Sequence, residues 1–313
     1  MTHHPRIASL SAVFLLLAAP LAAQVRDRVH DAAAIAADYV VVPNITYMRA
    51  DGYESKLDVH RPRDMAAPRP TVIFIHGGGW VGGSKETSMM AVAPYLAMGF
   101  AAVNVEYRMA ANAPAPASIE DCRCALKWVI ANAKENGFDT SKIVVTGTSA
   151  GGHLALTTGM LTQAAGFDDR CPTPEGNGVA PDNPKVAAIV NWFGITDVYD
   201  VIQGTNVKIY GVRWFAGVDD KAAAARRASP LNYVRPGLPP IITIHGDADP
   251  TVPYAQAVAL RDALTKAGVS NELVTIPGGG HGNFVAPQRD RAWTAIRAFL
   301  DKLSIPPAAT TVQ

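Results

Sequence analysis

The chain has 313 residues, of which 49% are apolar, 18% charged and 7% aromatic. This composition is that of a globular protein with enough apolar mass for one large core or two smaller ones. With 28 Lys and Arg against 27 Asp and Glu, the net charge is +1, which gives no electrostatic reason to expect a nucleic acid or an anionic membrane as partner. Three cysteines are too few for a disulfide scaffold, and no Cys-x-x-Cys pair suggests a zinc or redox site.

The N-terminal segment has the features of a secretory signal peptide. Arg6 gives a weakly positive start, residues 7–19 form an apolar run, and small residues lead to Gln24. The run is shorter than the about 20 residues that a membrane-spanning helix needs. We expect cleavage after Ala23, which removes residues 1–23 and leaves a secreted or periplasmic protein without stable membrane insertion.

Export would place the cysteines in an oxidising compartment. Cys122 and Cys124 stand two positions apart on a predicted helix, a spacing at which side chains do not face each other. Either of them can bridge to Cys171 and leave the other thiol free. Three unpaired thiols are the alternative, and the sequence leaves both open.

Short apolar strands alternate with helical patterns along the rest of the chain. An antiparallel pair comes first, at residues 40–48 and 56–60. β-Branched runs without polar alternation follow, as expected for strands covered by helices on both faces: residues 72–75, 101–105, 143–146, 186–190, 241–244 and 272–276. Helical patterns lie at residues 86–98, 117–136, 150–163, 253–268 and 287–303. The alternation predicts one α/β domain with a mostly parallel sheet over residues 24–303.

Two segments interrupt this alternation. Residues 164–184 are rich in Gly, Pro, Asp and Asn, which indicates a surface insertion. Residues 194–236 carry scattered aromatic side chains. Because ligands bind at the carboxyl edge of such sheets, we interpret this second insertion as a small cap over the site. Residues 304–313 contain Pro306-Pro307 and small side chains, which predicts a disordered tail.

The most specific motif is Gly147-Thr148-Ser149-Ala150-Gly151, between a predicted strand and a predicted helix. A Gly-x-Ser-x-Gly sequence alone is a weak signal. In this context it is the turn that lifts a serine hydroxyl above the sheet, and its glycines avoid the clash that side chains would make there. The motif predicts that Ser149 is a nucleophile.

A second glycine motif, His76-Gly77-Gly78-Gly79-Trp80, ends another predicted strand. A lone glycine triplet is usually a flexible turn. Here, upstream of the nucleophile, it lets the backbone expose its amides to a negatively charged oxygen. The N–H groups of Gly78, Gly79 and Ala150 are therefore predicted to form an oxyanion hole.

A serine hydroxyl needs a base, and the base needs an orienting carboxylate. Among the eight histidines, His281 alone follows the last predicted strand in a glycine-rich loop. His153 lies on the helix directly behind the serine, where it can support the site, whereas His245 at a strand end is typical of a structural histidine. Asp247 and Asp249 compete as the acid, since two residues so close on a loop cannot both point at His281.

Together these segments resemble the α/β-hydrolase superfamily over residues 40–303. The motifs at residues 76–80, 147–154 and 245–253 are similar to those of bacterial carboxylesterases of the feruloyl and acetylxylan esterase-like (BD-FAE-like) group. In that group the acid is the aspartate three residues after the His-Gly pair, which implies Asp249, with Asp247 left to cap a turn. Hormone-sensitive-lipase-like esterases share His-Gly-Gly-Gly but usually carry Asp-Pro-Leu and Asp-Glu around the acid, which this chain lacks. The resemblance implies ester hydrolysis through an acyl-enzyme, with no cofactor, and the sequence supports no metal site.

The substrate expected from this resemblance is a small-molecule or polysaccharide-linked ester. Aromatic residues at strand ends and in the cap are candidates for its pocket, although such residues are more often core: Trp80, Trp192, Phe193 and Trp214.

Two other function classes stay in view. An amide hydrolase, either a formamidase or a prolyl-oligopeptidase-like peptidase, shares the fold and the catalytic residues. Such a peptidase usually carries an N-terminal propeller, which we do not expect before residue 40, and a formamidase is usually intracellular. A non-catalytic binding module typically loses the serine or the histidine, and this chain has both.

Overall fold

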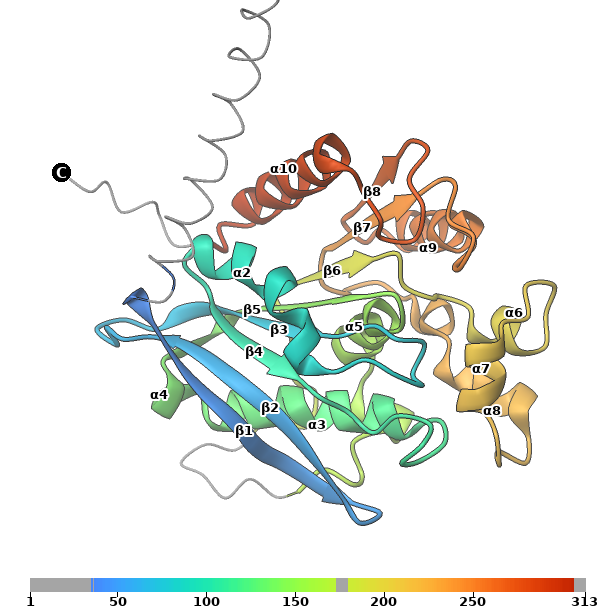
Figure 1. Ribbon diagram of the computed structural model, residues 1–313, viewed down its shortest axis with the longest axis horizontal. Coiled ribbons are helices and arrows are strands. Elements are labelled where there is room, and N and C mark those ends of the chain that lie inside the picture. The colour runs from blue at the N-terminus through green and yellow to red at the C-terminus, as the bar shows by residue number, and fades with distance from the viewer. Residues whose placement is uncertain (1–34, 36, 173–179, 307–313) are drawn as a thin grey trace, which may run out of the picture.

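A computed structural model of the chain describes residues 35, 37–172 and 180–306. The predicted signal peptide and residues 307–313 lie outside this range. Within it, one eight-stranded sheet forms the centre of the molecule, in the order β1-β2-β4-β3-β5-β6-β7-β8 (Figure 1). The strands β1 and β2 pair with each other and β2 with β4 in antiparallel fashion, and all the remaining pairs are parallel. The predicted α/β class is confirmed. The strands are β1 (Tyr39–Ala50), β2 (Tyr53–Pro62), β3 (Arg69–Ile75), β4 (Ala101–Val105), β5 (Phe138–Thr148), β6 (Ala188–Trp192), β7 (Ile241–Gly246) and β8 (Asn271–Ile276).

Helices cover both faces of the sheet, which explains why its central strands are apolar throughout. On one face α2 and α10 pack over one buried cluster, and on the other α3, α5 and α9 pack over a second. The helices of these layers are α2 (Met89–Ala97), α3 (Ala117–Ala131), α4 (Ala133–Asn136), α5 (Ala150–Met160), α9 (Tyr254–Lys266) and α10 (Ala286–Lys302), with 3-10 turns η1 (Lys85–Ser88) and η2 (Gln163–Ala165).

Most predicted boundaries shift by a few residues in the structure, and three of the differences have a clear reason. The strand expected at residues 186–190 begins at Ala188, where its pairing with β5 starts, and runs to Trp192. The helix expected at residues 117–136 is interrupted at Asn132, whose backbone leaves the helical region. The tail expected from residue 304 was wrong at its start, because Ile305 is 2% exposed and packs into the core.

The cap prediction is matched by a helical insertion between β6 and β7. Its elements are α6 (Val198–Ile202), α7 (Ile209–Trp214), α8 (Lys221–Ala228) and η3 (Pro230–Tyr233). They gather beyond one end of the sheet, beside the carboxyl ends of β5 and β6 (Figure 1). In the described part of the chain, no helix combines the length and apolarity that crossing a membrane requires.

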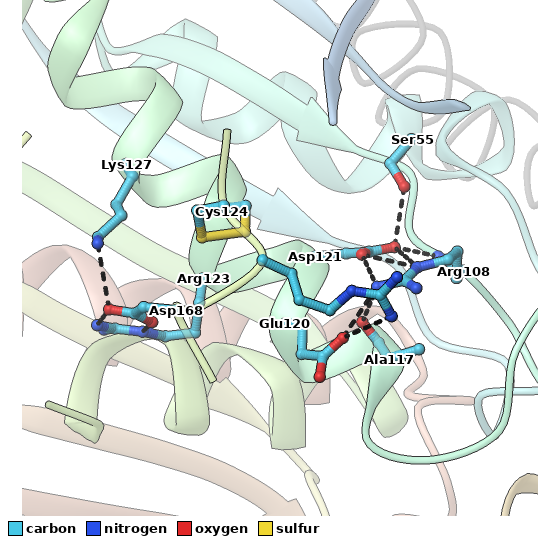
Figure 2. The surroundings of a disulfide bond; sticks show 11 residues. Ser55, Arg108, Ala117, Glu120, Asp121, Arg123, Cys124, Lys127 and Asp168 are labelled. Carbon is cyan, nitrogen blue, oxygen red and sulfur yellow. Dashed lines mark hydrogen bonds and ion pairs between the residues drawn. A yellow bond between two sulfur atoms is a disulfide. The ribbon is translucent and has the colours of Figure 1, made fainter. Parts of the chain in front are cut away.

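The insertion that begins at residue 164 is linked to α3 by a disulfide and an ion pair. Cys171 forms a disulfide with Cys124, whereas Cys122 is a buried free thiol, so the structure selects one of the pairings that the sequence left open. Arg123, the residue before Cys124 on α3, makes a second link to this insertion. Its guanidinium donates two hydrogen bonds, of 2.7 and 2.6 Å, to the Asp168 carboxylate. Figure 2 shows the disulfide and this ion pair side by side. Residues 173–179 of the insertion lie outside the described range.

A second buried ion pair holds the loop that follows β4. Arg108 is fully buried, and its guanidinium donates to both oxygens of Asp121 and to Glu120 on α3 (Figure 2). Ser55 of β2 donates to the same Asp121 carboxylate at 2.9 Å. A buried cation of this kind must be paired to be tolerated, and these carboxylates supply the partners of Arg108.

Candidate active site

Ser149 stands in the tight turn between β5 and α5. Its φ of 57° and ψ of −121° lie in a sparsely populated region for a residue with a side chain. The turn is held from both sides, because Ser149 N–H donates to the Trp192 carbonyl at 2.9 Å and a Cβ on Gly151 would lie 2.1 Å from the Ile75 carbonyl oxygen. Only glycine fits at that position, as the motif predicted.

The loops after β5, β7 and β8 bring a serine, an aspartate and a histidine into one line. His281 Nε2 lies 2.8 Å from Ser149 Oγ, and His281 Nδ1 lies 2.7 Å from Asp249 Oδ2. The imidazole is therefore bonded to the hydroxyl on one side and to the carboxylate on the other. This is the geometry in which a histidine can take the serine proton while the carboxylate stabilises the resulting imidazolium.

Asp249 is held as an anion by its surroundings. Its other oxygen, Oδ1, accepts from the Thr251 and Val252 N–H groups at 2.7 and 3.0 Å. Burial raises the pKa of this carboxyl, but hydrogen bonds from His245, His281 and the Val252 backbone outweigh it and hold the pKa below its usual range. The carboxylate thus stays charged beside the imidazole at neutral pH.

The hydrogen-bond partners of Asp247 and Asp249 distinguish the two candidate acids. Asp247 points to another turn, where its Oδ1 accepts from the Gly278 N–H at 2.7 Å. His245, interpreted from sequence as structural, is fully buried with Nε2 3.3 Å from Asp249 Oδ2 and 3.0 Å from the Val252 carbonyl. Its place four residues before the acid was the one signal that could have linked it to the site.

The glycine loop after β3 faces Ser149 across a cavity of about 460 Å³. Gly78 has a φ of +119°, and a Cβ there would lie 1.9 Å from the Gly82 carbonyl oxygen, so this backbone path excludes side chains. Ala150 is the first residue of α5, where backbone N–H groups have no partner within the helix. The structure thus places all three predicted oxyanion residues around the serine. The cavity is lined by Gly77, Gly78, Gly79, Thr148, Ser149, Phe193, Tyr210, Thr251, His281, Gly282 and Asn283.

Tyr210 of α7 also lines the cavity, and no sequence motif predicted it. A Cβ on Gly79 would lie 2.7 Å from Tyr210 Cβ, and the tyrosine hydroxyl donates to the Thr251 carbonyl at 3.2 Å. The cap therefore contacts both the oxyanion loop, which is the glycine loop at residues 76–80, and the loop that carries Asp249. The one sequence signal for this role was that Tyr210 is among the aromatic residues of the predicted cap, residues 194–236.

Comparison with known proteins assigns the family. The family model BD-FAE matches residues 57–264. The chain belongs to the BD-FAE family of α/β-hydrolases. Esterase LipC of Mycobacterium tuberculosis is 33% identical over 72% of this chain, and carboxylesterase NlhH of the same organism is 30% identical over 75% of it and 74% of NlhH. The chain spans about half the length of LipC and of esterase LipQ, 56% and 52% respectively.

Solved structures agree with this assignment. The propionate-bound Est2 esterase of Thermogutta terrifontis superposes with a TM-score of 0.70 at 27% identity, covering 85% of this chain and 95% of that one. A truncated carbohydrate esterase from gut microbiota gives a TM-score of 0.70 at 28% identity, over 85% of this chain and 97% of that one.

Two of the aromatic pocket candidates in this BD-FAE protein are core residues. Trp80 and Trp214 are both fully buried and stack on each other with ring centroids 4.2 Å apart. The prediction that they line the substrate pocket was wrong. Trp80 has a φ of 59°, and its ring stacks in the core instead of lining the cavity.

The other two candidates line cavities at this end of the sheet. Phe193 lines the Ser149 cavity, and together with Trp192 it lines a second cavity of about 270 Å³. The two cavities adjoin, since both are bordered by Thr148, Phe193 and Gly282. The second is strongly aromatic, and its remaining lining residues are Phe74, Met90, Ala91, Phe284, Arg289 and Trp293. Across residues 35, 37–172 and 180–306, no three His, Cys, Asp or Glu side chains gather closely enough to hold a metal ion.

Proposed function

We propose that this BD-FAE protein is a serine hydrolase that cleaves carboxylic esters, with Ser149, His281 and Asp249 as its catalytic residues. The observation that carries the proposal is the continuous hydrogen-bonded line from Ser149 Oγ through His281 to Asp249. Esterases and a carboxylesterase among the relatives support it. So does the name of one similar structure, T. terrifontis esterase 2 phosphorylated by paraoxon, at 25% identity.

In the proposed acylation step, Ser149 Oγ bonds to the ester carbonyl carbon while His281 Nε2 takes the hydroxyl proton. The carbonyl oxygen becomes an oxyanion, which the N–H groups of Gly78, Gly79 and Ala150 stabilise. The bond to the alcohol oxygen then breaks, and His281 returns the proton to that oxygen. Water repeats the sequence on the acyl-enzyme, which releases the acid and restores the serine.

For the substrate we propose an ester with an aryl or short acyl group, free or attached to a carbohydrate. The aromatic cavity that adjoins the Ser149 cavity supports an aryl group, because flat rings stack well on Trp and Phe side chains. The similar carbohydrate esterase supports the carbohydrate-linked form.

The test is hydrolysis of p-nitrophenyl acetate, butyrate and octanoate and of methyl ferulate by the wild type, Ser149→Ala and Ser141→Ala. Ser141 is an exposed serine of the same strand and serves as the matched control. We expect turnover that is lost in Ser149→Ala and kept in Ser141→Ala. No turnover by the wild type, or turnover that Ser149→Ala retains, would contradict the proposal. Amide substrates such as p-nitroanilides and N-formyl compounds, and then a binding role, would be examined next.

We also propose that the protein is exported after cleavage behind Ala23. The N-terminal pattern supports this, and so does the disulfide between Cys124 and Cys171, because disulfides persist in oxidising compartments. Sequencing the N-terminus of the protein recovered outside the cytoplasm is expected to give Gln24 first. A protein retained in the cytoplasm with its first residues intact would contradict export.

A further inference from the structure

A buried imidazole joins the nucleophile helix to the oxyanion loop and the cap. His153 is fully buried on α5, and its backbone N–H donates to the Ser149 carbonyl at 3.0 Å. Its Nδ1 lies 3.2 Å from the indole Nε1 of Trp80, next to the oxyanion glycines. Its Nε2 lies 2.8 Å from the carbonyl oxygen of Ala228, where the cap helix α8 ends. The proposed mechanism does not use this side chain.

The two partners fix the protonation state of His153. An indole N–H can only donate, so His153 Nδ1 must accept from Trp80. A carbonyl oxygen can only accept, so His153 Nε2 must carry the proton that bonds to Ala228. The neutral tautomer with the proton on Nε2 is the one state that satisfies both contacts. Burial lowers the pKa of His153 to about 4, and the hydrogen bond to Ala228 opposes this only in part.

Trp80 is the part of the oxyanion loop that the imidazole contacts. Its φ of 59° is strained for a residue with a side chain, and strain of this kind persists where the surroundings over-determine it. The indole is held by stacking on Trp214 and by the edge of the His153 ring, with centroids 4.2 and 5.0 Å away. Because Gly78 and Gly79 directly precede Trp80, the direction of their amides depends on where this indole is held.

We propose that His153 is a positioning residue, which aims the oxyanion amides at the serine by accepting a hydrogen bond from Trp80. This rests on the proposed ester hydrolysis. Hydrogen bonds from these amides stabilise the neutral ester carbonyl of the ground state only weakly, but they stabilise the oxyanion strongly. Loss of the contact therefore lowers kcat and spares KM. A residue that only fills the core would lower stability and leave kcat unchanged.

The test uses variants that separate the acceptor from the volume of the ring. His153→Leu has similar bulk but no acceptor, and His153→Asn can offer an amide oxygen near the position of Nδ1. Trp80→Phe removes the donor, keeps an aromatic ring against Trp214, and provides a second route if His153→Leu does not fold. Each variant and the double variant Trp80→Phe/His153→Leu are assayed on p-nitrophenyl acetate.

A trifluoromethyl ketone supplies a readout specific to the oxyanion. Ser149 Oγ adds to its carbonyl carbon, the hydroxyl proton passes to His281, and the carbonyl oxygen becomes an anion in the oxyanion hole. We expect His153→Leu and Trp80→Phe to lower kcat and ketone affinity together, by about 10- to 100-fold, with KM within about twofold. His153→Asn should recover most of both, and the double variant should be no worse than the single ones.

Variants that lose stability but keep kcat and ketone affinity within about twofold would overturn the inference, as would full additivity in the double variant. A wild type that does not hydrolyse the ester, or that hydrolyses it as fast as Ser149→Ala, would contradict the proposed function and with it the inference. The wild-type assay therefore separates the two failures.

Discussion

Phe193 packs the edge of its ring against the imidazole of His281, with centroids 4.8 Å apart and planes at 64°. The contact is close because Gly282 has no side chain, and a Cβ there would lie 2.8 Å from Phe193 Cζ. The same ring borders both cavities beside the serine. One aromatic residue at the end of β6 thus contacts the base and forms a wall that the two cavities share.

Shortening this ring should impair catalysis more than packing alone explains. Phe193→Leu removes the contact with His281, so we expect kcat/KM on p-nitrophenyl butyrate to fall about 10-fold. Phe299→Leu is the matched control, since Phe299 is also buried in the same cluster but lies on α10. Both should lose about 1 kcal/mol or more of stability. Equal kcat/KM in the two variants would contradict this role for Phe193.

The oxyanion loop offers a matched pair of glycines. Gly78→Ala places a Cβ against the Gly82 carbonyl at a positive φ, so the loop must move, and we expect kcat to fall about 10²- to 10³-fold. Gly82→Ala meets nothing within 4 Å and should change kcat by less than about twofold. Steady-state kinetics on p-nitrophenyl acetate measures both. A Gly78→Ala variant with normal kcat would place the oxyanion elsewhere.

The disulfide should support stability and leave turnover unchanged. It closes a loop with a sequence separation of 47, for which the chain-entropy estimate is about 4 kcal/mol. Cys171→Ala should lose about 2–4 kcal/mol in urea unfolding, while Cys122→Ala, which removes the free buried thiol, should lose less. Thiol titration of the unfolded wild type without reductant should find one thiol. Three thiols would contradict the bond.

His153 should make stability depend on pH. Its pKa is about 4 in the folded protein and about 6.5 when unfolded, so between these values the unfolded chain binds a proton that the folded one does not. The free energy of unfolding therefore falls as the pH drops from 6.5 to 4, by about 3 kcal/mol for this group.

The check is urea unfolding of wild type and His153→Asn at pH 7, 5.5 and 4. Asparagine does not titrate, so the stability difference between the two proteins should change by about that amount across the range. A constant difference would show that His153 is protonated alike in both states.

Sequence patterns predicted the parts of the site that depend on backbone paths. The tight turn at Ser149 and the loop at Gly78 both require glycine. Because glycine alone adopts such backbone conformations and close approaches at little cost, its positions in the sequence predict these turns. The placement of His281 followed from the order of strands. The choice of the acid did not follow from the order of strands. Asp247 and Asp249 differ only in which turn each carboxylate closes, so the family pattern was needed to choose Asp249.

What the sequence could not predict depends on where side chains point. Trp80 was assigned to the pocket because it adjoins the oxyanion glycines, yet its ring stacks in the core on Trp214. Tyr210 enters the cavity because α7 folds back over the glycine loop, a tertiary contact with no local signal. The choice between Cys122 and Cys124 likewise depends on which face of α3 meets the insertion.

The central claim is that Ser149 is the nucleophile, and covalent labelling tests it most directly. Incubation with paraoxon should attach one diethylphosphoryl group per chain, found by peptide mass spectrometry on Ser149, and hydrolysis of p-nitrophenyl acetate should be lost in proportion. Ser149→Ala should take up no label under the same conditions. A label on another residue, or full esterase activity in a protein labelled at Ser149, would contradict the account.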